Sequence, residues 1–172
     1  WKPLTTGVFS AHGKVTVEDG ALVLSRGDRQ TGVVYTGEFP KEHYEVSLEA
    51  RRVEGSDFFC GMTFPVGDEP CTLILGGWGG NVVGLSNVDG SSAVENETTS
   101  GKTFENGRWY AIRLRVTPGK IEAWIDGQQY IDLPRGGHQF SVWYEQEQCR
   151  PFGFSTWDTT GALRNINLKR LP

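Results

Sequence analysis

The sequence predicts an all-β protein, a two-sheet antiparallel β-sandwich, and three observations support that prediction. Apolar and polar residues alternate with a period of two along most of the chain, which is typical of strands that bury one face. Turn residues separate these segments at intervals of about 8–12 residues, the spacing found in sandwiches and barrels. Glycine contributes 23 of the 172 residues, about twice its usual share, and supplies such turns.

Strands are predicted in order along the chain from this alternation, bounded by turns that contain Gly, Pro or Asp. The predicted strands are Lys14–Val17, Ala21–Ser25, Gly32–Thr36, Tyr44–Arg51, Phe58–Phe64, Cys71–Gly76, Val82–Ser86, Trp109–Val116, Ile121–Ile125, Gln129–Leu133, Gln139–Tyr144, Phe152–Thr156 and Leu163–Arg170. A short helical turn is expected near Lys41. The polar stretch Ser86–Phe104 is long for a compact domain, which indicates either a binding loop or a mobile surface loop.

Length and composition bound the class of protein. One domain, residues 1–172, is expected because a domain has about 150 residues and this length buries a core unaided. The net charge is −4 and no basic run occurs, so we expect no nucleic-acid partner. No apolar run approaches the roughly 18 residues of a membrane-spanning helix, so we expect no membrane insertion. The chain begins at Trp1, which suggests a mature or excised part of a larger multidomain protein.

Cys60 and Cys71 are predicted to be free, buried thiols. If Phe58–Phe64 and Cys71–Gly76 form a hairpin, Cys71 lies opposite Phe64. Cys60 is then roughly 13 Å away at about 3.3 Å per residue, whereas a disulfide needs Cα atoms within about 7 Å. Because Cys149 makes the number odd, at most one internal bridge could form in any case.

Three segments resemble a known family. Glu105–Leu114 (ENGRWYAIRL), Lys120–Gly127 (KIEAWIDG) and Ala162–Lys169 (ALRNINLK) are similar to segments of bacterial DUF1080 domains, also called 3-keto-disaccharide hydrolase domains. Those domains are close in fold to fructan-binding modules of the CBM66 kind. The resemblance implies a concanavalin A-like jelly roll and a carbohydrate ligand. We further expect an extracellular, periplasmic or cell-surface location.

One segment departs from the family pattern. Many DUF1080 domains resemble one another in a glycine-tyrosine-glutamate-valine-glutamine segment on the sheet that carries the site, but Cys71–Gly80 holds no carboxylate here. The E-x-D-x-x-E run of laminarinase-like enzymes of this fold is also absent. The nearest same-face pair, Glu45 and Glu49, is roughly 13 Å apart at Cα. A retaining glycosidase needs carboxyls about 5–5.5 Å apart and is therefore disfavoured.

Tryptophans are the leading candidates for sugar contact. An indole packs against the apolar C–H face of a sugar, and its N–H can donate to a hydroxyl. Trp78 stands out because glycines flank it on both sides and leave room for a ligand. Trp157, followed by Asp158, is the second candidate. The alternative in each case is a core tryptophan, as most tryptophans in sandwiches are.

Polar residues on a sheet face form the second group of candidates. Glu49 and Arg51 lie two apart on one predicted strand, hence on one face, and Arg113 is a similar candidate on another strand. Asn96 and Glu97 add an amide and a carboxylate in the long loop. Such side chains suit hydrogen bonds to sugar hydroxyls, or else they form a solvated face with weak ion pairs.

No motif requires a metal or cofactor. The histidines are far apart in the sequence and lack zinc-ligand spacing. A structural calcium ion is an option, because lectin-like sandwiches often hold one and several aspartates lie near predicted turns. These are Asp19, Asp68, Asp89 and Asp158, and isolated turn aspartates usually only form turns.

The leading interpretation is a non-catalytic carbohydrate-binding module with a site made of Trp78, Trp157, Asp158, Glu49, Arg51, Asn96, Glu97 and Arg113. The alternative is a glycoside-cleaving enzyme of the 3-keto-glycoside type, as the family name implies, with Glu97 or Glu49 as the general base. A further alternative is an adhesion domain whose apolar patch contacts a protein.

Overall fold

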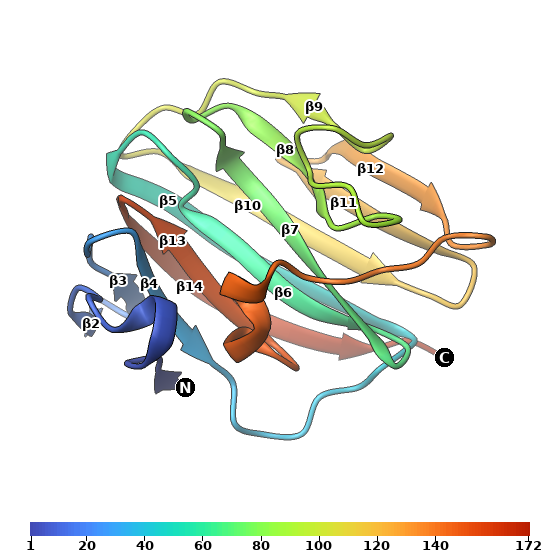
Figure 1. Cartoon of the computed structure of the whole chain (residues 1–172), viewed down its shortest axis with the longest axis horizontal. Coiled ribbons are helices and arrows are strands. Elements are labelled where there is room, and N and C mark those ends of the chain that lie inside the picture. The colour runs from blue at the N-terminus through green and yellow to red at the C-terminus, as the bar shows by residue number, and fades with distance from the viewer.

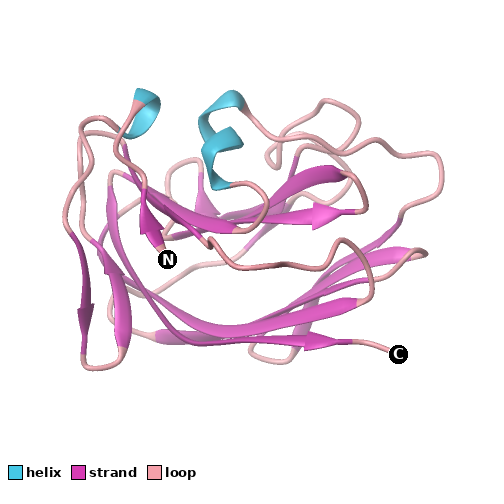
Figure 2. Ribbon diagram, turned by 90° about the horizontal axis from the view of Figure 1, so that it is seen from below, coloured by secondary structure: helices cyan, strands magenta, loops and turns pink.

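The computed structural model describes all residues, 1–172, and consists of two antiparallel sheets of seven strands each. Figure 1 shows the long strands of the two layers, and Figure 2 shows the layers stacked face to face. We call them sheet A and sheet B. Sheet A has the order β1 (Lys2–Pro3), β4 (Gln30–Val34), β13 (Gly153–Trp157), β6 (Cys60–Val66), β7 (Glu69–Gly77), β8 (Val82–Ser86) and β9 (Ser100–Gly101).

Sheet B contains the longest strands. Its order is β12 (Gln128–Pro134), β11 (Lys120–Ile125), β10 (Trp109–Val116), β5 (Tyr44–Gly55), β14 (Thr159–Arg170), β3 (Ala21–Leu24) and β2 (Val15–Glu18). The only helices are two short 3₁₀ segments, η1 (Gly7–Phe9) and η2 (Tyr144–Cys149). Both lie outside sheet A, on the side away from sheet B (Figure 2). The jelly-roll sandwich predicted from the sequence is confirmed.

The core fills the space between the sheets, as the period of two predicts. In β5, Tyr44, Val46, Leu48 and Ala50 are buried, and the residues between them face outward. These side chains belong to one cluster of 31 buried residues drawn from both sheets. Each sheet therefore also has an outer face, and the polar candidates of the sequence must lie on one outer face or the other.

The predicted hairpin registers are correct. Phe64 pairs with Cys71 and Cys60 pairs with Leu75 across β6 and β7. Cys60 and Cys71 are free and buried, as predicted, and the structure shows the same for Cys149. Burial raises the pKa of the Cys60 thiol to about 12, so that this group is an inert thiol at neutral pH.

Two local predictions are wrong. Gln139–Tyr144 is not a strand: only Phe140 makes a bridge, with Val88, and the chain then enters η2. The alternating apolar residues there are Phe140, Val142 and Tyr144, but Phe140 is buried whereas Tyr144 is exposed, so they do not share a sheet face. No helical turn forms near Lys41, where the chain bends into β5 instead.

The structure contains no helix that could span a membrane.

Candidate functional site

A pocket that contains three tryptophans lies on the outer face of sheet A. It has a volume of about 370 Å³ and is lined by strand residues, η2 and the loop after β7. Its lining consists of Asp57, Phe58, Ile74, Trp78, Ser86, Trp143, Glu145, Gln146 and Trp157. The pocket brings together Trp78 and Trp157, the two tryptophans singled out from the sequence, and adds Trp143, which sequence reasoning missed.

Small residues on the outer face of sheet A let the covering segments approach closely. Gly84 in β8 illustrates this, because a Cβ there would lie 2.9 Å from the carbonyl oxygen of Ala93 in the covering loop. Ala93 packs with Phe58 and Ile74 in a small apolar cluster against Trp157. The loop that contains Ala93 therefore covers part of the outer face of sheet A, and the pocket lies beside this covered part.

Trp78 reaches the pocket because the chain turns sharply after β7. The β7–β8 register shifts between Leu75 and Gly77, and Trp78 itself adopts a left-handed φ of +46°. Gly80 closes the turn at φ +117°, where a Cβ would lie 2.9 Å from the carbonyl oxygen of Ser56. The register shift is a bulge in the strand pair, and Trp78, which follows it, is 44% exposed and lies outside the core.

A buried arginine supports this turn from below. Arg52 is only 6% exposed, and its guanidinium donates to four oxygen acceptors. They are the side chain of Asn106 and the backbone carbonyls of Asp57, Gly80 and Phe104. Arg52 has no carboxylate partner within salt-bridge distance, and burial lowers its pKa from the usual value. Its charge therefore serves to fix the backbone around Asp57 and Trp78.

The other two indoles stand on the remaining walls of the pocket. Trp157 packs on Phe58 with ring centroids 6.3 Å apart. Trp143 is 44% exposed and precedes η2, whose Gln146 N–H donates to the Trp143 carbonyl. The only sequence signal for Trp143 was its residue type, because its segment had the pattern of a strand.

A buried amide network holds η2 against the sheet. Ser155 Oγ donates to Gln146 Oε1 at 2.6 Å, and Gln146 Nε2 donates to Gln30 Oε1 at 3.0 Å. Gln30 Nε2 is buried without a protein partner. These contacts fix the position of Gln146 in the pocket wall and, with it, those of its neighbours Trp143 and Glu145.

Two carboxylates, Asp57 and Glu145, line the pocket, and the sequence analysis selected neither. Asp57 accepts a hydrogen bond from the Phe58 N–H at 2.8 Å. Burial raises the pKa of Asp57, the Phe58 and Gly79 N–H groups oppose the shift, and Asp158 adds to it. Asp158, a predicted sugar contact, accepts the Arg29 N–H at 2.9 Å and acts on the pocket through its charge on Asp57.

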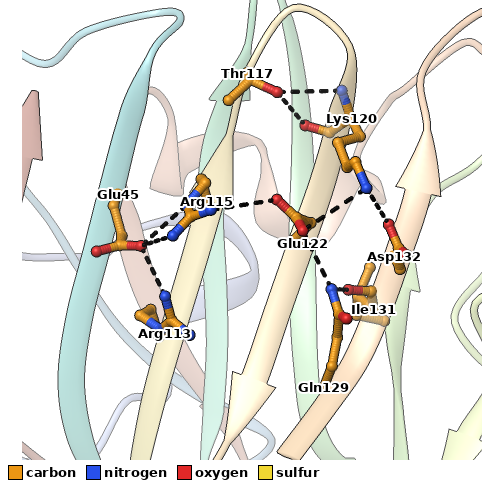
Figure 3. Close-up of polar contacts among 9 residues, drawn as sticks. All are labelled: Glu45, Arg113, Arg115, Thr117, Lys120, Glu122, Gln129, Ile131 and Asp132. Atoms are coloured by element: carbon orange, nitrogen blue, oxygen red, sulfur yellow. Dashed lines mark hydrogen bonds and ion pairs between the residues drawn. The ribbon is translucent and has the colours of Figure 1, made fainter. Parts of the chain in front are cut away.

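The predicted polar row lies on the opposite side of the molecule. Glu49, Arg51 and Arg113 are on the outer face of sheet B, in β5 and β10. Arg113 and Arg115 both donate to Glu45 there, and Figure 3 shows these residues with the neighbouring Glu122. Glu49 accepts bonds from Arg164 and Asn165. The structure therefore does not bring this row together with Trp78 and Trp157.

The two candidates in the long loop have partners within the protein. Asn96 Nδ2 donates to the carbonyls of Leu85, Ser91 and Ser92, so that its side chain organises the loop. Glu97 lies 3.1 Å from His138 Nε2, and Asp89 lies 2.6 Å from His138 Nδ1. The mobile-loop alternative is not supported, because these contacts tie the loop to the rest of the chain.

Of the aspartates considered for calcium, only Asp89 belongs to a cluster of potential metal ligands, together with Glu97 and His138. Calcium takes about 6–8 oxygen ligands. Here an imidazole lies between the two carboxylates, and the Asp89 bond raises the pKa of His138. This donor set suits an ion-paired imidazolium better than a calcium ion.

The chain belongs to the family of 3-keto-alpha-glucoside-1,2-lyase-like domains, which matches residues 1–169. This agrees with the family resemblance seen in the sequence. Among curated proteins, no relative matches the chain.

Solved structures of low sequence identity share the fold. The carbohydrate-binding module CBM66 from Bacillus subtilis is 14% identical over 92% of both chains, with a TM-score of 0.58. A Bacillus subtilis protein with a galectin-like fold is 12% identical, with a TM-score of 0.66 over 92% of this chain and 86% of that one. An O-glycanase of the human gut microbiota is 14% identical, with a TM-score of 0.59 over 92% and 83%.

Proposed function

We propose that the chain is a carbohydrate-binding module that holds a sugar in the pocket on sheet A. One observation carries this proposal: Trp78, Trp143 and Trp157, which are far apart in the sequence, line the same open pocket. The family name and the carbohydrate-binding neighbour support a carbohydrate ligand. We also propose that the module acts outside the cytoplasm, as part of a larger protein.

The chemistry of the pocket suits a sugar. The indoles offer flat apolar faces to the C–H groups of a pyranose or furanose ring, and the carboxylates of Asp57 and Glu145 can accept hydrogen bonds from hydroxyls. A volume of about 370 Å³ is at the lower end of the range for ligand pockets, about 300–1,000 Å³. We therefore propose that about one or two sugar rings enter, and that affinity is modest because binding costs consume most of the contact energy.

The second candidate function is 3-keto-glycoside cleavage, and the position of Asp57 favours it. A base that removes the proton from the carbon next to the ketone leaves an electron pair that can expel the glycosidic oxygen. Burial raises the pKa of Asp57, which suits a general base in a pocket. Glu49 is on the other sheet and Glu97 faces His138, so Asp57 replaces both as the candidate base.

The experiment is a glycan array and polysaccharide pull-down with the purified chain, beside Trp78→Ala. The matched control is Trp124→Ala, which removes an indole from the outer face of sheet B. We expect Trp78→Ala to lose binding and Trp124→Ala to retain it, with no sugar released. Binding that survives in Trp78→Ala would place the ligand elsewhere. No binding to any glycan would overturn the proposal and leave a protein-adhesion role.

Turnover of a 3-keto-glycoside separates the two candidate functions. Asp57→Asn should abolish turnover if Asp57 is the base, whereas a binding module loses only part of its affinity for the sugar. Product release by the unaltered chain, absent in Asp57→Asn, would establish the enzyme.

A further inference from the structure

We propose that the sugar held in this pocket carries a positive charge, as a protonated amino sugar does. The inference rests on the proposed function, because it concerns the same pocket and names the class of glycan. It follows from the charges and aromatic faces that the pocket presents, and from the absence of any cation among its lining residues.

The pocket is acidic and has no basic residue. Asp57 and Glu145 are its only ionisable lining groups, and no Lys, Arg or His lines it. Neither carboxylate forms an ion pair with a protein cation, although twelve such pairs form elsewhere in the chain. Two half-buried carboxylates without a counter-ion attract an ammonium group and repel a carboxylate or sulfate.

The charge of Arg52 acts on Asp57 and opposes the rise in its pKa, but Arg52 forms no ion pair with the Asp57 carboxylate. Arg52 directs its donors to Asn106 and to three backbone carbonyls, among them the carbonyl of Asp57 itself. The Asp57 carboxylate is instead held by backbone N–H groups, with the charge of Asp158 nearby. An arriving ammonium would place a positive charge in direct contact with the Asp57 carboxylate, which no side chain of the protein does.

The indole rings of the pocket also have no Lys or Arg side chain stacked over them. All the cation–aromatic contacts within the chain involve other rings, such as Trp109 and Trp124 on sheet B. Trp78 and Trp143 are each 44% exposed and contact no Lys or Arg in this way. A cation over an indole face is attracted by the ring quadrupole, and this pocket combines such faces with carboxylates. That combination is typical of sites for ammonium ligands.

The test uses ligands that differ at one substituent. Calorimetry would compare short oligosaccharides of glucosamine, N-acetylglucosamine and glucose, all β-1,4-linked and of equal length, at neutral pH. We expect the glucosamine oligomer to bind at least about tenfold more tightly than the other two, and added salt to weaken this preference.

Matched variants separate the pocket from general attraction between an acidic protein and a cation. Asp57→Asn and Glu145→Gln should each lower glucosamine binding about three- to tenfold more than they lower neutral-sugar binding, because the amide keeps an acceptor oxygen but loses the charge. Glu38→Gln, at an exposed carboxylate outside the pocket, removes the same charge and should change neither. Two independent variants keep the test valid if one of them fails to fold.

The outcomes are distinguishable. Equal or tighter binding of the acetylated or neutral oligomer would overturn the amino-sugar inference and leave the proposed function intact. An amine preference that Glu38→Gln lowers as much as Asp57→Asn would also overturn it. Failure of every glycan on the array and of all three oligomers would overturn the proposed function itself.

Discussion

Both outer faces of the sandwich carry tryptophans and carboxylates, but sheet B pairs them and sheet A leaves them unpaired. On sheet B, Trp109 has the guanidinium carbons of Arg51 and Arg164 at 4.6 and 3.9 Å from its ring centroid. Trp124 has Arg113 at 3.8 Å and Arg115 at 5.3 Å. On sheet A, the pocket indoles have no such partner.

The carboxylates follow the same division. Glu45 and Glu122 lie within ion-pair distance of arginines or a lysine on sheet B, as Figure 3 shows. Asp57 and Glu145 have none. The comparison shows that residue type alone does not mark a binding site. A candidate binding site is indicated by an aromatic face without a cation partner in the protein, or by a charge without an ion-pair partner.

The largest effect is expected from Arg52, which supports the pocket from beneath. Arg52→Ala removes a charged donor from four oxygen acceptors, two of them, the carbonyls of Gly80 and Phe104, in buried contacts. We expect a loss of about 2–4 kcal/mol in the free energy of unfolding, because each buried hydrogen bond to a charged group contributes about 1.5–3 kcal/mol. Urea denaturation measures it, and a loss below about 1 kcal/mol would show that Arg52 is not needed.

Trp143→Ala tests whether the indole that sequence reasoning missed belongs to the site. We expect a loss of sugar affinity of about tenfold, because its exposed face lines the pocket. Trp124→Ala, on the paired face, should leave affinity unchanged. Calorimetry with any glycan bound by the unaltered chain measures both, and equal effects of the two changes would remove the contrast between the faces.

The pH dependence of amino-sugar binding tests the charge of Asp57. Protonation of Asp57 removes an attraction, so affinity should fall as the pH decreases, beginning at a higher pH than for an ordinary aspartate with a pKa near about 3.9. The free energy of unfolding should change in the opposite direction and rise as the pH decreases. Ionised Asp57 destabilises the fold fully above its raised pKa, and this effect is absent below the pKa of the unfolded state. Asp57→Asn should flatten both dependences. Calorimetry and denaturation across pH 3–7, a range of roughly four units around the usual carboxyl pKa, measure them.

His138 joins the long loop to the segment before η2 through Asp89 and Glu97. The hydrogen bond to Asp89 raises the pKa of His138. The ion pairs therefore stabilise the loop fully below the unfolded pKa of about 6.5 and lose this effect as the pH rises through the folded value. Hydrogen exchange of the loop amides should be slower at pH 6 than at pH 9 after correction for intrinsic rates. Glu97→Gln should reduce the difference, and unchanged protection would argue against the pairing.

Glu45→Gln should have the smallest effect. Its partners Arg113 and Arg115 are more than one-third exposed and also stack on Trp124. We therefore expect at most about 1 kcal/mol of lost stability and no change in sugar binding. Thermal denaturation and calorimetry measure these, and a change in sugar affinity would show that sheet B contributes to the site.

The strands could be predicted from the sequence because their signal is local. Side chains alternate between the two faces of a strand, so Tyr44, Val46 and Leu48 identify a buried face without any knowledge of the partner strand. The same reasoning failed at Gln139–Tyr144, where Phe140, Val142 and Tyr144 have the spacing of one strand face. Phe140 is buried where it bridges Val88 and Tyr144 is 74% exposed, so their environments do not follow the period of a strand.

The sequence by itself determined the sandwich, the register of the β6–β7 hairpin, the unbridged state of Cys60 and Cys71, and the prominence of Trp78 and Trp157. It also placed Glu49 and Arg51 on one face of one strand. Only the tertiary structure decided that this face belongs to sheet B, away from the pocket, and that Asp57, Trp143 and Glu145 join the two tryptophans. The physical reason is that alternation is set within a strand by backbone geometry, whereas a site is set by which loops and layers meet across long sequence separations.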